Sequence, residues 1–307
     1  MRTVYCEALM ELAASDEKIV SINCDLTSSM GLKGFEKAFP DRAVNVGIQE
    51  ANGCSLAGGM SAAGMKPFFH TFAVFATRRV YDQIFMCCAY PGLNVKIVGG
   101  DPGICATYNG GTHMAFEDAG IMRVMPNVTI FEPTDAVMLR SLVRKMADTY
   151  GVQYMRMPRK ASWCIYEEGS EFEFGKGVVL REGSDVTIMA YGIMVKEALD
   201  AADLLAAEGI GARVVDMFTI KPLDQDCVAE SVKKTGCIVT AENHQIIGGL
   251  GSAVSEYTAG NCPCPVERVG IEDEFGEVGT QEYLAGRFRL TADHIAEKAR
   301  IAIERKG

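Results

Sequence analysis

A single carboxylate stands where a strand-like segment gives way to small residues, in the stretch NVGIQEANG at residues 45–53. The run AVNVGI leads into Glu50, and the nearly uncharged stretch ANGCSLAGGMSAAG follows it. Burying a lone carboxylate costs free energy unless a specific group binds it or it takes up a proton. The pattern therefore predicts that Glu50, unpaired within its own segment, meets a ligand.

An aromatic segment, HTFAVFATRRVYDQ, begins 20 residues after Glu50. Phe72, Phe75 and Arg78 are spaced three residues apart, so a helix would place them along one side. Two aromatic rings near a carboxylate suit a flat heteroaromatic ligand, which would stack on its faces and hydrogen-bond at its edge. The same spacing is also typical of two core phenylalanines, and spacing alone favours that alternative.

A Gly-rich loop, GGDPGICATYNGGTHMAFED, follows a predicted strand and contains His113. Ligands of α/β proteins bind at the loops that follow strands, which makes His113 a candidate functional residue. Arg156 and Arg159 lie near the end of another predicted strand, and Arg2 is available from the N-terminus. Each arginine is a candidate for an anionic substrate, although a single arginine is more often a solvated surface charge.

The composition is that of a globular protein, with 307 residues, 48% hydrophobic and 23% charged, and a formal net charge of -10. This acidic balance argues against nucleic acid and against an anionic membrane as the main partner. The 11 cysteines mostly lie in apolar runs, and Cys262 and Cys264 lack metal-ligand spacing. No apolar run reaches membrane-spanning length and no signal peptide is evident, so we expect a reduced, cytoplasmic protein.

Helical and strand patterns alternate along the chain, which predicts an α/β protein with mainly parallel sheets. Expected strands of the first half are IVSINCD, AVNVGI, NVKIVGG, VTIFEP and VQYMRMP, and expected helices are YCEALMELAAS, RRVYDQIFMCCAY and DAVMLRSLVRKMADTY. The second half repeats this rhythm from DVTIMAYG to the terminal helix TADHIAEKARIAIERK. We predict one domain over residues 1–160, a linker with edge strands over 161–185, and a second domain over 186–307.

Four segments of the first half, VGIQEANG, TFAVFATRRVYDQ, YNGGTHMAFED and VMPNVTIFEPTDA, together resemble the C-terminal half of transketolase. AENHQIIGGLGSAVSE and FGEVGTQEYL in the second half are similar to that family's C-terminal domain. The whole chain resembles more closely the separate C-terminal subunit of transketolases that are split into two polypeptides. The resemblance implies a pyrimidine-binding domain, a parallel sheet with helices on both faces, followed by a transketolase C-terminal-like α/β domain. It also implies transfer of a two-carbon ketol unit from a ketose donor to an aldose acceptor.

The resemblance implies thiamine diphosphate as the ligand of Glu50, because the family's corresponding glutamate contacts the aminopyrimidine ring and shares a proton with a ring nitrogen. Glu50 and His113 are then the expected catalytic residues, with His113 facing the reacting end of the donor. The expected cofactor-binding residues are Glu50, Phe72, Phe75, Arg78 and Asp25. The expected substrate-binding residues are Arg2, Ser29, Asp101, Asn109, His113 and Arg159. Of these, Arg2, Ser29 and Arg159 match positions that hold a sugar phosphate, although DLTSSMGL around Ser29 also resembles a helix N-cap.

Two positions depart from the family's pattern. Asp101 stands where a phosphate-contacting histidine is usual, and Tyr108-Asn109-Gly110 replaces the usual Glu-Asp-Gly. A carboxylate facing a phosphate dianion is repulsive. Either the donor lacks a terminal phosphate or holds it differently, or Asp101 points away from it.

The Gly-Asp-Gly signature that the family uses to hold the Mg²⁺ of the cofactor's diphosphate is absent from the sequence. We therefore expect half a site in this chain. The implied partner is a transketolase N-terminal, diphosphate-binding subunit that also holds Mg²⁺, and the family's dimeric arrangement implies an α2β2 assembly. Two alternatives stay open. One is a decarboxylating subunit like 1-deoxyxylulose-5-phosphate synthase or the 2-oxoacid dehydrogenase β chain, which RRVYDQ resembles, and the other is a non-catalytic scaffold subunit.

Overall fold

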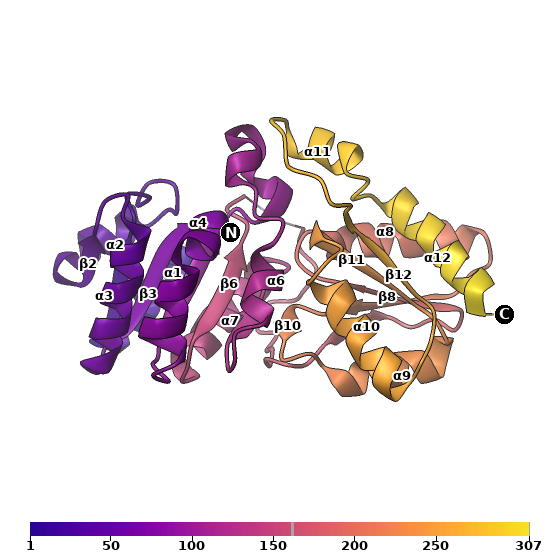
Figure 1. The fold of residues 1–307 in the computed structure, drawn as a ribbon, viewed down its shortest axis with the longest axis horizontal. Coiled ribbons are helices and arrows are strands. Elements are labelled where there is room, and N and C mark those ends of the chain that lie inside the picture. Colours follow the sequence, from indigo (N-terminus) through magenta and orange to yellow (C-terminus); the bar gives the residue numbers. More distant parts are fainter. Residues whose placement is uncertain (161–162, 307) are drawn as a thin grey trace.

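The structure of the protein is a computed structural model that describes residues 1–160 and 163–306. It contains two sheets, each flanked by helices (Figure 1). The first sheet has the strand order β10-β5-β6-β4-β3-β1-β2, and the second has the order β12-β11-β8-β9-β7. The pairs within the first sheet are parallel except that β10 runs antiparallel to β5, and in the second sheet only β7 pairs in the antiparallel sense. The expected α/β class is confirmed.

The strands of the first sheet are mostly buried on both faces, as the parallel arrangement requires. They are β1 (Ile19–Asn23), β2 (Ala43–Asn45), β3 (Lys66–Phe72), β4 (Lys96–Gly100), β5 (Thr129–Phe131), β6 (Gln153–Met157) and β10 (Thr219–Lys221). The helices of this half are α1 (Arg2–Ser15), α2 (Lys33–Ala38), α3 (Glu50–Ala62), α4 (Ala73–Ala76), α5 (Tyr81–Ile84), α6 (Asp118–Arg123) and α7 (Ala136–Asp148).

The second sheet is built from the C-terminal half together with one edge strand from the segment that joins the halves. Its strands are β7 (Val178–Arg181), β8 (Val186–Ala190), β9 (Ala212–Asp216), β11 (Ile238–Gln245) and β12 (Val266–Ile271). Its helices are α8 (Met194–Ala207), α9 (Gln225–Thr235), α10 (Leu250–Asn261), α11 (Gln281–Arg287) and α12 (Ala292–Lys306).

Most of the expected elements are present, and the exceptions have physical causes. The run ARVVDMFTI, expected as one strand, splits into β9 of the second sheet and β10, which crosses to the first sheet. The predicted helix RRVYDQIFMCCAY consists of a 3-10 turn, a short α-helix and a π-helical turn. The strand β3 was not expected, because KPFFHTF does not alternate between apolar and polar residues. In the structure it lies between β1 and β4 and pairs with both.

The loop that follows β4 contains two short 3-10 helices, η4 (Gly103–Asn109) and η5 (Gly111–His113). Asp101, Gly103, Thr107 and Gly110 all have positive φ angles, so the backbone repeatedly leaves the ordinary right-handed region. Such a loop keeps its shape only when neighbouring elements hold it.

A buried guanidinium connects the two halves of the chain. Arg156, at the end of β6, donates from Nε to Asp118 at 2.8 Å and pairs with Glu132. It also donates to Tyr191 Oη at 3.2 Å and to the backbone carbonyl of Asn243 at 2.9 Å, both in the second half. The interface between the halves is therefore organised around one fully buried cation.

We predict that Arg156→Met lowers the free energy of unfolding by about 3–5 kcal/mol, because two buried carboxylates lose their shared partner. Urea unfolding of the isolated chain measures this loss. Arg144→Met is the matched control, since its ion pair with Glu11 is largely exposed and is worth at most about 1 kcal/mol. Equal losses in the two variants would contradict the prediction.

Candidate active site

Glu50 is the first residue of α3, where its carboxylate is almost completely buried. Arg79 donates from Nη1 to Glu50 Oε2 at 2.9 Å, and the Thr71 hydroxyl donates to Oε1 at 3.3 Å. The partner of Glu50 thus comes from outside its own segment, because tertiary folding brings in an arginine 29 residues away. The looser bond leaves Oε1 as the oxygen that is less firmly held.

The aromatic segment is not one helix. Phe72 ends β3, and the four-residue helix α4 carries Phe75, so the regular spacing does not align Arg78 with the two rings. Arg79 instead lies over the Phe75 ring, with its guanidinium carbon 3.7 Å from the ring centroid. Arg79 thus contacts both Glu50 and Phe75, and it occupies one face of that ring.

His113 lies against both phenylalanines. Its ring is 5.7 Å from that of Phe72 and 5.2 Å from that of Phe75, in edge-on arrangements. Its Nδ1 is hydrogen-bonded to the Thr112 hydroxyl, at 3.0 Å, and this bond does not use Nε2. The structure therefore brings together the two predicted rings and the predicted histidine, which are more than 35 residues apart in the sequence.

The strand register explains this convergence. Phe72 of β3 pairs with Gly100 of β4, and Gly100 pairs in turn with Met157 of β6. The residues that follow these strand ends, Asp101 and Arg159, therefore meet beside Phe72. The guanidinium carbon of Arg159 lies 5.3 Å from the centroid of the Phe72 ring.

Three of the predicted anion-binding residues form one cluster. Arg2 and Arg159 both donate from Nη1 to the backbone carbonyl of Ser29, at 3.3 and 3.4 Å. Asp101 is buried and points toward Arg159, accepting from its backbone N–H at 3.1 Å and pairing with its guanidinium. The N-cap alternative for Ser29 is wrong, because α2 begins at Lys33 with no side-chain cap.

Arg156, the other arginine that the sequence offered for an anionic substrate, is wrong as a ligand candidate because it is sealed between the two halves. Arg78 pairs with Glu117 at 2.9 Å and donates to the Thr112 carbonyl at 3.4 Å. It therefore contacts the loop beside His113 and has no contact with the ring of Phe75 among the described interactions.

Asp25 and Asn109 are both exposed. Asp25 follows β1 with a positive φ of 59°, and its backbone N–H donates to Asn45 at 3.1 Å. Asn109 is exposed at the end of η4. Their expected contacts, with cofactor and substrate respectively, stay predictions.

Two buried groups near the site are held in their neutral forms. Burial, and then the nearby Glu50 carboxylate, raises the pKa of the Cys24 thiol to about 12, so this cysteine stays protonated. Burial lowers the pKa of His70 to about 4, and the neutral ring contacts Tyr5 Oη at 2.6 Å and the Ile22 carbonyl at 3.0 Å. Neither group is suited to be a nucleophile or a base at neutral pH.

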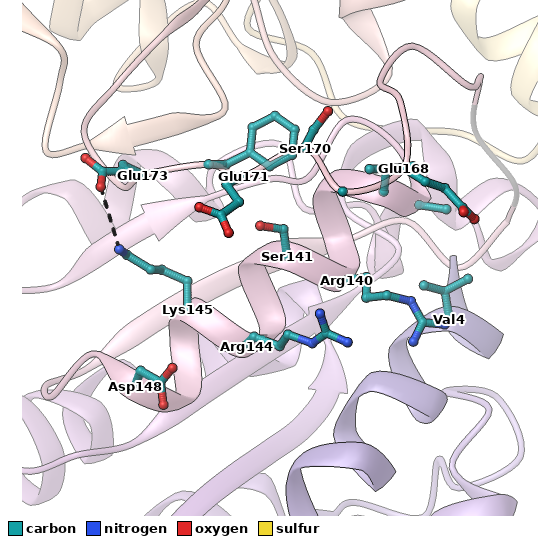
Figure 2. A pocket seen from close by; sticks show the side chains of 14 residues that line it. Val4, Arg140, Ser141, Arg144, Lys145, Asp148, Glu168, Ser170, Glu171 and Glu173 are labelled. Atoms are coloured by element: carbon teal, nitrogen blue, oxygen red, sulfur yellow. Dashed lines mark ion pairs between the residues drawn. The ribbon is translucent and has the colours of Figure 1, made fainter.

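A separate groove of about 760 Å³ lies between α7 and residues 168–173. Figure 2 shows Arg140, Ser141 and Lys145 on one side of it and Glu171 and Glu173 on the other. None of the predicted site residues lines this groove, so it is distinct from the cluster around Glu50.

The first half of the chain, residues 1–162, matches the family model "Transketolase, pyrimidine binding domain", and residues 175–295 match "Transketolase, C-terminal domain". The chain therefore belongs to the transketolase family. It is 48% identical to the 6-deoxy-6-sulfo-D-fructose transketolase subunit SqwH of Clostridium sp. (strain MSTE9), with 100% of this chain and 95% of that protein covered.

A solved structure described as a split-gene transketolase in an inactive beta4 tetramer has a TM-score of 0.92 and 43% sequence identity, covering 100% of this chain and 98% of that one. The 1-deoxy-D-xylulose-5-phosphate synthase 1 of Geobacter sulfurreducens is a more distant relative, 36% identical over 99% of this chain but only 48% of that protein. These comparisons support a subunit of a split, thiamine diphosphate-dependent transketolase that acts with a partner.

Sequence reasoning did not single out Arg79, Thr71 and Glu117. Arg79 and Thr71 contact Glu50, and Glu117 pairs with Arg78. The sequence gives only a weak indication of Arg79, which is its position next to the predicted residue Arg78. Its role could not be distinguished from that of Arg78 without the break between α4 and the 3-10 turn Arg78–Val80.

We predict that Arg79→Met lowers the free energy of unfolding by about 1–3 kcal/mol, because Glu50 Oε2 loses its donor while buried. Adding Glu50→Gln is expected to restore part of this loss, which a double-mutant cycle in urea measures. Arg78→Met is the control, with an expected loss below about 1 kcal/mol because its pair with Glu117 is half-exposed. Strictly additive losses from Arg79→Met and Glu50→Gln would contradict the proposed coupling.

Proposed function

We propose that this chain is the pyrimidine-binding subunit of a two-chain, thiamine diphosphate-dependent transketolase. The observation that carries the proposal is a buried carboxylate, Glu50, placed near an aromatic pair and a histidine at the ends of parallel strands. The reaction would transfer a two-carbon ketol unit from a ketose to an aldose.

The residues present fit the cofactor's pyrimidine ring. Glu50 would supply a carboxylate oxygen for a ring nitrogen, and Phe75 would offer the face of its ring that lies opposite Arg79. Phe72, Arg78 and Asp25 are proposed to complete the chain's share of this site. When bound, thiamine diphosphate would supply the carbanion chemistry that breaks and forms the carbon–carbon bonds.

Glu50 would exchange a proton with the ring at Oε1, the oxygen that accepts the longer bond, from the Thr71 hydroxyl. Arg79 fixes Oε2 and thereby orients the carboxylate. His113 would contact the donor's reacting hydroxyl end through Nε2. Phe72 and Phe75, which pack against His113, would exclude water from one side of the His113 ring.

A partner subunit is proposed to supply the diphosphate site and to hold Mg²⁺, since the sequence has no Gly-Asp-Gly. The proposed assembly is an α2β2 heterotetramer, which the split-gene neighbour supports through its self-association and which the exposed position of Asp25 would suit. No described helix is long and apolar enough to span a membrane. The proposed location is cytoplasmic.

The two alternatives are less well supported. A decarboxylating role rests on the more distant synthase relative. A scaffold role gives no reason for Glu50, Phe75 and His113 to converge at one place.

The test is native mass and turnover of the complex recovered from the source cell through this chain. We expect a companion of about 30 kDa bearing Gly-Asp-Gly. Glu50→Gln is expected to assemble normally and to lose at least about 10³-fold in kcat, because the carboxylate is needed for proton exchange. The control Glu168→Gln, an exposed carboxylate in the separate groove beside α7, is expected to retain most activity. Unchanged turnover in Glu50→Gln would leave the scaffold alternative.

We propose further that the donor ends in a sulfonate. The relative with 48% identity is named for 6-deoxy-6-sulfo-D-fructose, a ketose that carries this group. In this chain Arg2 and Arg159 provide two positive charges near Ser29, and buried Asp101 offsets one of them. These three side chains together carry one net positive charge, which matches a sulfonate monoanion better than a phosphate, whose second pKa of about 6 makes it nearly a dianion at neutral pH.

Asp101→Asn is expected to shift donor preference by about 10-fold or more toward phosphorylated ketoses, because it removes the repulsive charge while Asn keeps an acceptor for the Arg159 N–H. The measurement is the ratio of kcat/KM for a sulfonated and a phosphorylated ketose in the assembled complex. Asp148→Asn, which removes an exposed carboxylate at the end of α7, is the charge-matched control for the ratio. An unchanged ratio in Asp101→Asn would contradict the charge argument.

A further inference from the structure

The second domain reaches the loop that carries His113, and this contact has no role in the site described above. Asn243 lies on β11 with its side chain completely buried. Its Nδ2 donates to the Pro102 carbonyl at 3.1 Å, and its Oδ1 accepts from the Ile104 N–H at 2.9 Å. One amide therefore binds both the backbone acceptor and the backbone donor at the start of the loop.

The loop sequence accommodates this amide. A Cβ atom at Gly103 would lie 2.1 Å from Asn243 Oδ1, and the φ of Gly103 is +56°. Only glycine allows both the close approach and the backbone conformation. The loop and the asparagine are thus fitted to each other across the domain boundary.

Further contacts anchor the same loop in the second domain. Ile104, Ala106, Met114 and Phe116 belong to the apolar core of that domain. A Cβ at Gly111 would lie 2.1 Å from the carbonyl oxygen of Gly276, so η5 also packs directly on the second domain. The His113 end of the site is therefore set by the second domain, whereas Glu50 and Phe75 belong to the first.

We propose that Asn243 is a positioning residue, which sets the conformation of residues 102–113 and through it the place of His113 and Asn109 against the donor. Three positive φ angles follow Pro102, at Gly103, Thr107 and Gly110, and the bidentate amide fixes the start of this irregular path. Asn243 touches neither Glu50 nor Phe75, so it acts on the donor side of the site and not on the pyrimidine side.

This inference rests on the proposed function only for its kinetic readout. The experiment uses the complex of this chain with its diphosphate-binding partner and compares wild type with Asn243→Ala and Asn243→Asp. Thr240→Val is the matched control, because Thr240 is on the same strand and its buried hydroxyl has no hydrogen-bond partner within the described residues.

We expect Asn243→Ala to lose about 10- to 100-fold in kcat with affinity for thiamine diphosphate unchanged within about threefold, since a misplaced group costs rate and not cofactor binding. Asn243→Asp, which keeps the acceptor for the Ile104 N–H, is expected to retain more activity than Asn243→Ala. Amide hydrogen exchange in the isolated chain is expected to accelerate at residues 103–113 and to stay unchanged at residues 50–62.

Two results would overturn the proposal: a kcat within about twofold of wild type, or exchange that accelerates equally throughout the second domain together with weaker cofactor binding. A wild-type complex with no transferase activity would instead refute the proposed function. The exchange comparison would then still test Asn243, because it needs no turnover.

Discussion

The buried guanidinium of Arg156 is the interaction on which the arrangement of the two halves depends. It satisfies a carboxylate from α6, a carboxylate from the end of β5, and a backbone carbonyl of β11 at the same time. A buried cation of this kind tolerates little displacement, because each partner would otherwise be left charged or unpaired away from water. The carbonyl that it binds belongs to Asn243, whose side chain holds the loop before His113. The domain interface and the candidate site are therefore mechanically connected through one residue.

The charged residues of the candidate site form two separate groups. At the side proposed to bind the pyrimidine ring, one almost completely buried carboxylate is oriented by one half-exposed arginine. At the end proposed to bind the donor, two arginines share the Ser29 carbonyl and one buried aspartate offsets part of their charge. Phe72 lies between the two, close to both His113 and Arg159, and joins them into one surface.

The proposed division of the site between two chains has a structural counterpart within this chain. The first domain provides the residues expected to meet the cofactor, and the second domain holds the loop expected to meet the donor. The apolar cores show the same division. The segment around Ile104 and Phe116 packs with the second sheet, although it is continuous in sequence with β4 of the first sheet. A loop built this way transmits the position of one domain to the chemistry of the other.

The sequence by itself determined the alternation of strands and helices and the family, and it proposed Glu50, Phe75, His113 and Arg159 as site residues, because periodicity and motifs are local properties of the chain. It did not determine that Arg79 pairs with Glu50, that Asp101 faces Arg159, or that Arg156 is sealed between the domains. Those facts depend on the register of β3, β4 and β6 and on the break after α4, which place residues tens of positions apart in contact. Local preference decides which elements form, whereas the pairing of buried charges is decided only when packing removes water and each group must find a partner in three dimensions.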